Sequence, residues 1–477
     1  MVILLLSQSR NSLYVLLLLL LSIICTSYSF AADNKNSVEK YSEGLSLEDA
    51  LSIMVDNSPE LRILLESKTQ ANIDHSLAKS ALLPSARLEI EHSLQKDQLG
   101  ATADLSATNK HNKFSLYLRQ NIFNLSLISK ISRAAHLEQA NAIEGQAMLT
   151  SLLQTSVIAY FDVIAASYRV KISKEYLLSL GRIEKLVLKM RKTGSATVSD
   201  VKQVSEKLSV ARSNYSRYKA EFNSAGVKLA YLLHIISANS NPAELEVSEI
   251  LPKLTTSDFF MLSDKLVSLI PTDFKVLQNT VLRNNLEVLV KRADICSTIY
   301  QLEELNASKL PTLGVEGEVS SESDKEAPST NSSYAKITFS LAYDLFDPQL
   351  KHSISKVKST VREKEYRYDL EILNKRDTVY ALYNQLNTKE YQRGTLLNQI
   401  SSLEEIDRIY AQQIKFASRT LLERLENLNT LYGARLGLIE NDYQVLASRM
   451  ELIIMMGSLV EFFGYQNYIT SSSMNLC

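Results

Sequence analysis

The chain has 477 residues, of which 45% are hydrophobic and 22% charged, with 52 Lys and Arg against 53 Asp and Glu. This length is enough for two or three ordinary domains. The balanced charge argues against a nucleic-acid-binding surface, so no nucleic-acid partner is expected. Glycine (13), proline (8) and tryptophan (0) are scarce, and such a composition favours long uninterrupted helices.

Residues 1–31 have the organisation of a secretory signal peptide. Arg10 supplies the positive charge, Tyr14 to Cys25 is the apolar run, and Ser29 to Ala31 is a small-x-small cleavage site. A membrane anchor is the alternative for this segment, and Cys25 leaves lipidation open. Beyond it no run of 18 apolar residues occurs, so we expect no helix of the mature protein to span a membrane.

The rest of the chain is an internal duplication, which is the first feature to look for in a chain of this length. Three segment pairs match in the same order: Asn57–Glu91 with Asn284–Glu318, Gln120–Leu127 with Tyr343–Leu350, and Lys192–Val204 with Phe416–Leu428. The duplication predicts six parts: a signal peptide (1–31), an N-terminal segment (32–44), a first repeat (45–235), a polar connection (236–272), a second repeat (273–464) and a C-terminal tail (465–477).

Each repeat is expected to begin with one helix and to continue with a β-hairpin. The helices are predicted from Leu47 to Ala81 and from Phe274 to Ser308. A proline follows each, and then strands in which apolar and polar residues alternate, as in a sheet with one apolar face. Polar loops are predicted over 95–112 and 320–333, between the two strands of each hairpin.

A very long helix is expected after each hairpin, from Ser126 to Lys192 and from Gln349 to Lys415. Apolar residues recur there at three- and four-residue steps, which is typical of coiled coils. At 1.5 Å per residue, each helix would reach about 100 Å. The segments around Thr197 and Thr420 then turn the chain back into a return helix.

Four amphipathic strands in an exported protein have two possible environments. In a bilayer only helices and closed barrels satisfy their backbone, and even small barrels use eight strands. The strands are therefore either completed by other copies of the chain, with the apolar face on lipid, or they form small hairpins of a soluble helical protein. In the first case the polar face lines a lumen with four acids, Glu89, Glu91, Glu316 and Glu318.

The whole mature sequence resembles the TolC-like family of outer-membrane efflux and type I secretion channels. The resemblance rests on "LSLEDALSIMVDNSPELR", on "ALLPSARLEI" with its repeat "SKLPTLGVEG", on "LRQNIFN" and "AYDLFDP", and on the turns "GSATVSDV" and "SRTLLERLENL". It implies a mainly α fold with a small β part, in which two tandem repeats form long coiled-coil-like helices and two β-hairpins. Three chains would form an α-barrel topped by a 12-stranded transmembrane β-barrel.

The same resemblance implies a location and partners. The protein would lie in the outer membrane, in contact with its lipid, and extend into the periplasm. It would be a homotrimer and a passive conduit, opened by a periplasmic adaptor and an inner-membrane transporter. The cargo, whether a drug, a metal ion or a protein, is not specified by the sequence.

Two acids in the second turn, Glu423 and Glu426, have a structural and a functional interpretation. "TLLE" is a capping box in which Glu423 returns to the backbone N–H of Thr420, and this explains Glu423 by itself. Glu426 lies one helical turn later on the same face. The resemblance implies that both face the axis at a closed periplasmic gate, where three copies form rings of carboxylates that attract cations.

The resemblance also implies closure links between the two turns. Arg419 matches the arginine of these links, and Ser199 and Asp200 match its partners; a solvated Arg419 is the alternative. The chain departs from the family at these turns, since Glu423 and Glu426 stand where aspartate is usual, Ile414 where a tyrosine is usual and Ala417 where glycine is usual.

No motif indicates an enzyme. The sequence has no CxxC, GxSxG, P-loop or GxGxxG pattern, its six histidines include no i, i+4 pair, and no cofactor or metal is expected. Cys296 and Cys477, the cysteines beyond the signal peptide, do not indicate a disulfide framework. The alternative function is a periplasmic helical adaptor or a structural coiled-coil protein without a pore.

Overall fold

The computed structural model describes residues 45–98, 106–235, 262, 265–324, 332–414 and 420–466, all within one compact unit, Gly44–Cys477. The signal peptide, the N-terminal segment, most of the connection and most of the tail lie outside the described residues. The domain boundaries that the sequence predicts therefore stay a prediction. What the structure does define is the set of helices and strands within the two repeats.

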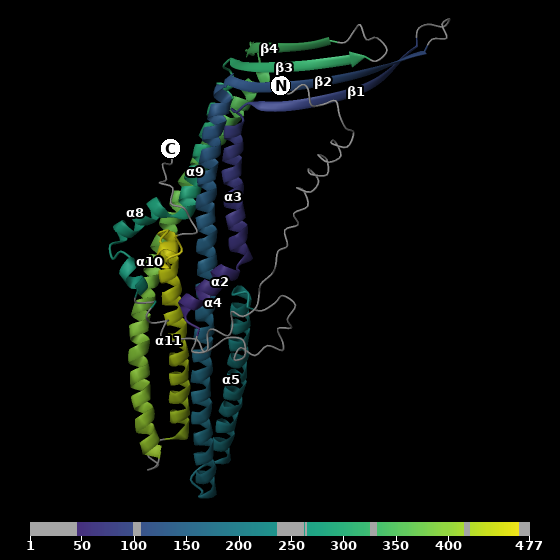
Figure 1. The fold of residues 1–477 in the computed structure, drawn as a ribbon. Helices are drawn as coiled ribbons and strands as arrows, with labels where there is room; N and C mark the ends of the chain where they lie inside the picture. The colour runs from purple at the N-terminus through teal and green to yellow at the C-terminus, as the bar shows by residue number, and fades with distance from the viewer. Residues whose placement is uncertain are drawn as a thin grey trace. The chain divides into compact units, whose positions relative to one another are not determined.

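The helix expected from Leu47 to Ala81 is divided into two (Figure 1). α2 spans Leu47–Asn57 and α3 spans Pro59–Ser80, with Ser58 in an extended conformation between them. Pro59 has no N–H to continue the bonding of α2 and fits the first position of a new helix. The Ser58 hydroxyl caps that helix by accepting the N–H of Leu61 at 3.1 Å.

The second repeat breaks at the equivalent place without a proline. α8 (Phe274–Asn284) and α9 (Leu286–Ala307) have the same lengths, 11 and 22 residues, as α2 and α3. The amide oxygen of buried Asn285 accepts the backbone N–H of both Glu287 and Val288, and its Nδ2 donates to the carbonyl of Met455. This tertiary contact holds Asn285 as a cap, so the single helix expected from Phe274 to Ser308 is wrong at this position.

The long helices are confirmed. α4 (Leu125–Lys192) has 68 residues and α10 (Pro348–Gln413) has 66. Each is followed by a return helix of 35 residues, α5 (Val198–Leu232) and α11 (Leu421–Met455), and α12 (Leu459–Phe462) closes the described chain.

One stretch of α4 is apolar enough to cross a membrane by length and composition, with a mean hydropathy of 1.4 over 18 residues. Within the fold, 56% of that stretch is buried. Tyr160 and Phe161 lie there and are fully buried, and the Tyr160 hydroxyl donates to the carbonyl of Leu45. We therefore interpret this part of α4 as a core helix.

The two hairpins form a single antiparallel sheet in the order β1-β2-β3-β4. The strands are β1 (Ser85–Gln98), β2 (Ser106–Phe123), β3 (Thr312–Asp324) and β4 (Ser332–Ala342). They extend into residues expected to be loop, because a backbone ladder continues wherever the register is kept and needs no apolar side chains. The expected polar loops are thus wrong in their boundaries.

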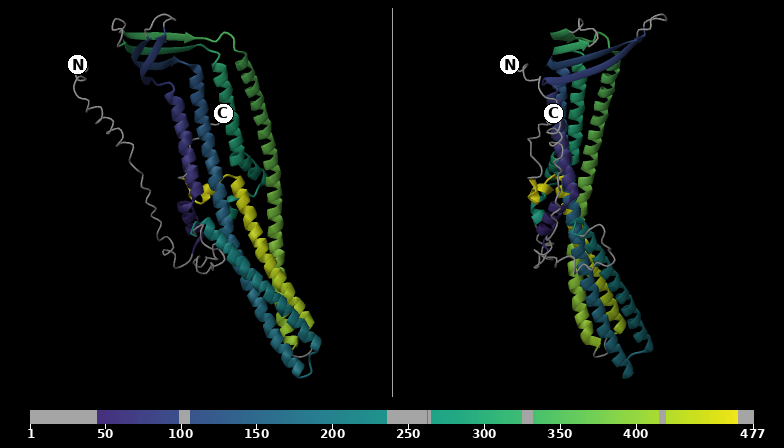
Figure 2. Two further views of the ribbon diagram at one scale, coloured as in Figure 1. Left: turned by 90° about the vertical axis from the view of Figure 1, so that its right-hand side faces the viewer. Right: turned by 45° about the vertical axis from the view of Figure 1, so that its right-hand side comes forward.

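The helices lie side by side beyond the sheet (Figures 1 and 2). α4 packs against α3, α5, α9 and α11, and α10 packs against α9 and α11. In the half of the helical layer next to the sheet, α3 and α10 are therefore the two outermost helices. In the half far from the sheet, the outermost helices are α5 and α10. The sheet has flanking strands as well, since β1 pairs only with β2 and β4 only with β3 among the described residues.

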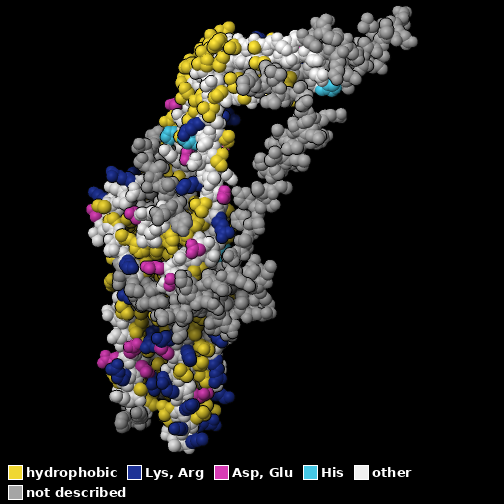
Figure 3. All heavy atoms as spheres, viewed as in Figure 1, with side chains coloured by type: hydrophobic (Ala, Val, Ile, Leu, Met, Phe, Trp, Pro, Cys, Tyr) yellow, Lys and Arg dark blue, Asp and Glu magenta, His cyan; other side chains and the backbone are white. Residues whose placement is uncertain are grey.

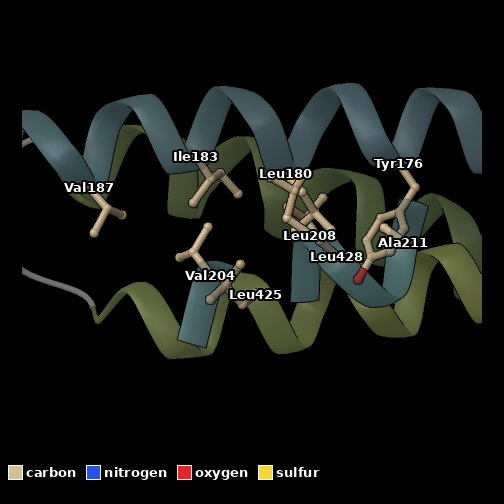
Figure 4. Packing of buried hydrophobic residues seen from close by; sticks show 9 residues of the cluster. All are labelled: Tyr176, Leu180, Ile183, Val187, Val204, Leu208, Ala211, Leu425 and Leu428. Carbon is tan, nitrogen blue, oxygen red and sulfur yellow. The ribbon is translucent and has the colours of Figure 1, made fainter. Parts of the chain in front are cut away.

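Two apolar clusters pack the helices, the first between the two repeats and the second within the second repeat. One joins α4, α5 and α11, with Leu180 and Ile183 of α4 facing Val204 and Leu208 of α5 and Leu425 of α11 (Figure 4). Another joins α8, α10 and α11, and its members are Leu277, Val281, Val379, Leu386, Val445, Leu452, Met455 and Met456.

The end of α11 requires glycine. Gly457 has a φ of +71°, and a Cβ there would lie 2.4 Å from the carbonyl oxygen of Asn284. Only a residue without a side chain permits this approach. The contact brings the end of α11 against the break between α8 and α9.

Cys296 lies buried in α9 and is disulfide-bonded. Its partner cysteine lies outside the described residues, because the other cysteines of the chain are Cys25 and Cys477. No disulfide framework was expected from the sequence, which did not predict this single bond.

Candidate functional site

The turn that leads into α11 is built by its own side chains. The Glu423 carboxylate accepts the backbone N–H and the hydroxyl of Thr420, both at 3.0 Å, and the Thr420 hydroxyl accepts the N–H of Glu423 at 3.4 Å. This is the reciprocal capping box that the sequence predicts. Capping is therefore one role of Glu423.

The turn into α5 has the same construction. The Asp200 carboxylate accepts the N–H of Thr197 at 2.7 Å and its hydroxyl at 2.8 Å, while the N–H of Asp200 donates to the Thr197 hydroxyl at 3.2 Å. Gly194, with a φ of +78°, supplies the left-handed residue after α4. Asp200 thus has an intrahelical role besides the closure link expected of it, and Ser199 beside it is exposed.

Glu426 differs from Glu423. Its side chain is exposed, and within the described residues no hydrogen bond or ion pair engages its carboxylate. Leu425 and Leu428 beside it are buried in the cluster that α11 shares with α4 and α5, which fixes the rotation of the helix. Arg419 lies outside the described residues, so its pairing with Ser199 or Asp200 stays a prediction, as does the gate.

The sheet has one apolar face. Cross-strand register places Leu88 beside Leu116 and Leu116 beside Val319, and the next row contains Leu118 and Ile337. These side chains are 44–73% exposed in the single chain. They occupy the half of each strand nearest the helices, where hydrophobic side chains gather on the sheet in Figure 3. An exposed apolar band of this extent indicates a surface that is covered in the assembled protein.

All four acids expected in a lumen lie on the opposite face, but three have partners there. Arg119 contacts Glu316 at 2.8 Å, and the Tyr334 hydroxyl donates to Glu318 at 2.8 Å. Arg87 is 3.7 Å from Glu89, and Glu91 lies opposite Lys113 in the ladder. This face is consequently polar and mixed in charge rather than simply acidic.

A further group of residues joins the two helical hairpins, and sequence reasoning missed it. Arg435 of α11 reaches Glu175 of α4 at 3.3 Å and Glu404 of α10 at 2.7 Å. Tyr176 of α4 stacks on Tyr432 of α11, with ring centroids 4.4 Å apart and planes at 8°. Glu175 and Arg435 are 260 residues apart, and no local pattern marks such a pair.

These residues line a groove of about 430 Å³ between α4, α10 and α11. Burial raises the pKa of both Tyr176 and Tyr432, so the stacked rings remain neutral at physiological pH. Arg424 and Asp407 form another contact at its rim, at 2.9 Å. A neutral aromatic stack and charged contacts therefore hold α4, α10 and α11 together along this groove, which we call the seam.

Arg435→Ala is expected to loosen this seam. Each charged contact of Arg435 is partly exposed and contributes only about 0 to 1 kcal/mol, but the substitution removes the contacts to α4 and α10 together. If the chain forms the channel that its resemblance implies, and if opening separates the two hairpins, single-channel conductance in planar bilayers should rise. Arg367→Ala is the matched control, because Arg367 pairs with Glu363 within α10 alone. Equal conductance of Arg435→Ala and the unsubstituted protein would show that the seam does not restrain the channel.

With this geometry established, we compared the chain with known proteins. Residues 277–458, which run from α8 to the end of α11, match the family of outer membrane efflux proteins. The resemblance to the TolC-like family is confirmed. No curated protein sequence matches the chain.

Solved structures share its fold. The outer membrane protein VceC of Vibrio cholerae has a TM-score of 0.71 and 13% identity, over 86% of this chain and 96% of VceC. The CmeC outer membrane channel of Campylobacter jejuni has a TM-score of 0.68 and 16% identity, over 89% and 90% of the two chains. The open state of the MtrE outer membrane channel of Neisseria gonorrhoeae has a TM-score of 0.65 and 15% identity, over 86% and 88%. The fold class predicted from the sequence is thereby confirmed as mainly α with a small antiparallel sheet.

Proposed function

We propose that the protein is the outer-membrane channel of a tripartite efflux pump and that three copies form the channel. The observation that carries the proposal is the sheet: within the part of the chain that the structure describes, it has four strands, one exposed apolar face and two unpaired edges, β1 and β4. In a bilayer such edges must be paired, and pairing β4 of one copy with β1 of the next closes a barrel. Three copies supply twelve strands, between the small filled barrels and the wide porins.

The dimensions of the apolar band support this placement. In β3 the band runs from Leu313 to Val319, and in β4 from Ala335 to Leu341. At about 3.3 Å per residue this is roughly 20 Å of strand, or about 15 Å along the membrane normal at a tilt of about 40°, which fits within the apolar band of about 25 Å of outer-membrane barrels. The more distant parts of the strands, such as Ser320–Asp324, are polar and would reach the cell exterior.

The flanking helices support a head-to-tail ring as well. α10 exposes Tyr366, Leu370 and Leu373, each more than half accessible, and α3 exposes Ile63 and Leu77 to a similar degree. The spacing on each helix is that of a coiled-coil seam. These apolar stripes lie on opposite flanks of the helices, as required if α10 of one copy packs against α3 of its neighbour.

In the assembled channel the long helices continue the pore through the periplasm, and the turns at Thr197 and Thr420 form its far end. A periplasmic adaptor and an inner-membrane transporter would open that end and supply the energy. Glu423 and Glu426 form the gate, and Arg419 with Ser199 or Asp200 forms the closure link. The alternative of an adaptor or a coiled-coil protein without a pore is not favoured, because neither requires a sheet with two open edges and an apolar face.

Fractionation and electrical recording test the proposal. The mature protein should be recovered from the outer-membrane fraction as a detergent-stable trimer and show low conductance in planar bilayers, since the gate is closed without partners. Its lumen would be lined by the face that carries Glu89, Glu91, Glu316 and Glu318. Recovery as a soluble periplasmic monomer would refute the channel.

A further inference from the structure

A basic stripe runs along the final third of α4. Seven positions at coiled-coil spacing carry six cationic side chains and one leucine, and all seven side chains are exposed. They are Lys171, Lys174, Leu178, Arg182, Lys185, Lys189 and Lys192. At 1.5 Å per residue the stripe is about 30 Å long. In Figure 3, Lys and Arg side chains gather at this end of α4 and α5, far from the sheet.

The stripe lies on the side of α4 away from its core. The buried residues of this part of the helix are Tyr176, Leu180, Ile183 and Val187. At 100° per residue, the stripe is centred roughly opposite them. Leu178 and Arg182 at its edge line the groove that α4 shares with α10 and α11, as do Glu404 and Asp407. All seven side chains remain exposed, so packing within the chain does not cover the stripe.

Within the described residues the six cations have no acidic partner. Arg182 donates to the Ser179 hydroxyl at 3.0 Å, and the other five side chains make no ion pair there. Like charges three or four residues apart destabilise a helix. Interaction with the C-terminal end of the helix dipole explains only the last turn, with Lys189 and Lys192, and not Lys171 or Lys174.

The second repeat shows that the fold does not need the stripe. At the seven corresponding positions of the second repeat only two residues are cationic: the residues are Gly394, Leu397, Ser401, Glu405, Arg408, Gln412 and Lys415. Since α4 and α10 have the same place in their repeats, a feature present in only one of them is not a requirement of the helix. The stripe therefore serves something that contacts the first repeat alone.

We propose that this stripe binds an acidic helix of a partner protein, aligned along α4 with Asp or Glu at coiled-coil spacing and an apolar residue against Leu178. The positive charge of the stripe indicates an acidic partner, and its narrow, straight shape along α4 indicates that the partner segment is a helix. A flat membrane would meet only the end of α4, whereas the cations extend along its axis. The inference rests on the proposed function only in placing this end of α4 in the periplasm, where a partner protein can reach it.

Binding of designed peptides to the purified, detergent-stable trimer tests the proposal. The probe is a helical peptide of three heptads with glutamate at the first and fourth positions of each heptad, apart from one central leucine. A peptide of identical composition with its glutamates at other positions serves as the control. We expect the first peptide to bind more tightly, and its binding to weaken as salt screens the contacts.

The variant is Lys185→Gln/Lys189→Gln, which should weaken binding of the first peptide by roughly three- to tenfold. Lys219→Gln/Lys228→Gln makes the same charge change at two exposed lysines of α5 and should leave binding unchanged. The proposal is overturned if both variants bind equally, or if the two peptides bind alike.

Two further results would contradict a protein partner and assign the stripe to a membrane surface or to the pore. Binding of phosphatidylglycerol vesicles that is lost in Lys185→Gln/Lys189→Gln, without peptide binding, would assign the stripe to a membrane surface. A changed ion selectivity of the same variant in planar bilayers, with peptide binding intact, would place the stripe inside the pore. In either case the trimer and its low conductance would persist, so failure of this inference is distinguishable from failure of the channel function.

Discussion

Ile337→Arg is expected to abolish recovery of trimers from the outer membrane. Ile337 lies in the apolar band of β4, is 73% exposed in the single chain, and shares a row with Leu118 of β2. An arginine on the lipid face of a barrel near the membrane midplane costs about 2 to 4 kcal/mol. Because each trimer would contain three copies, the cost triples in the assembly. The measurement is the amount of trimer in washed outer membranes.

Thr338→Arg is the matched control for this prediction. Thr338 is the next residue of β4, and its side chain lies on the polar face in the row of Glu316 and Arg119. An arginine there remains in an aqueous lumen beside a carboxylate and should leave the trimer yield unchanged. Equal yields from Ile337→Arg and Thr338→Arg would mean that the apolar face does not contact lipid.

Glu426→Gln is expected to weaken block of the channel by divalent and trivalent cations. Carboxylate rings hold cations strongly in a narrow pore, and high salt should relieve the block by screening. Removing one of the two rings should raise the half-blocking concentration by about tenfold or more, equivalent to about 1.4 kcal/mol. The measurement is current through planar bilayers as cation is added to the periplasmic side.

Substitutions of Glu423 can separate its role in capping α11 from its proposed role in the gate. Glutamine also serves at the third position of a capping box, so Glu423→Gln keeps the contacts with Thr420 and removes the charge. Glu423→Ala removes both and should cost roughly 1 kcal/mol of local stability. If the gate exists, the glutamine variant weakens block without destabilising the turn. Unchanged block in Glu423→Gln/Glu426→Gln would leave capping as the role of Glu423, and Glu363→Gln on exposed α10 controls for general charge loss.

Features that depend on neighbouring residues could be predicted from the sequence. The capping boxes at Thr197 and Thr420, the alternation in β1 to β4, and the extents of α4 and α10 all follow from side chains within one or two turns of each other. The duplication made these inferences stronger, because each pattern occurs twice. The family resemblance depended on the same local segments.

One error, the missed break at Ser58 and Pro59, concerned a local signal, and the others arose where a distant part of the chain decides the local conformation. Asn285 ends α8 because Met455 and Gly457 pack against it, and nothing near Asn285 announces this contact. The strands extend past their apolar residues because the opposite strand continues to offer hydrogen-bond partners. Disulfide bonding of Cys296 likewise depends on which parts of the chain meet.

By itself, the sequence determined the two repeats, the faces of the strands and the starts of α5 and α11, since these depend on periodicity and on side chains that bond to their own backbone. Only the tertiary structure decided that β2 pairs with β3, that Arg435 joins Glu175 to Glu404, and that the lumen acids have cationic and phenolic neighbours. The physical reason is separation along the chain: residues more than two hundred positions apart leave no shared pattern until packing brings them into contact.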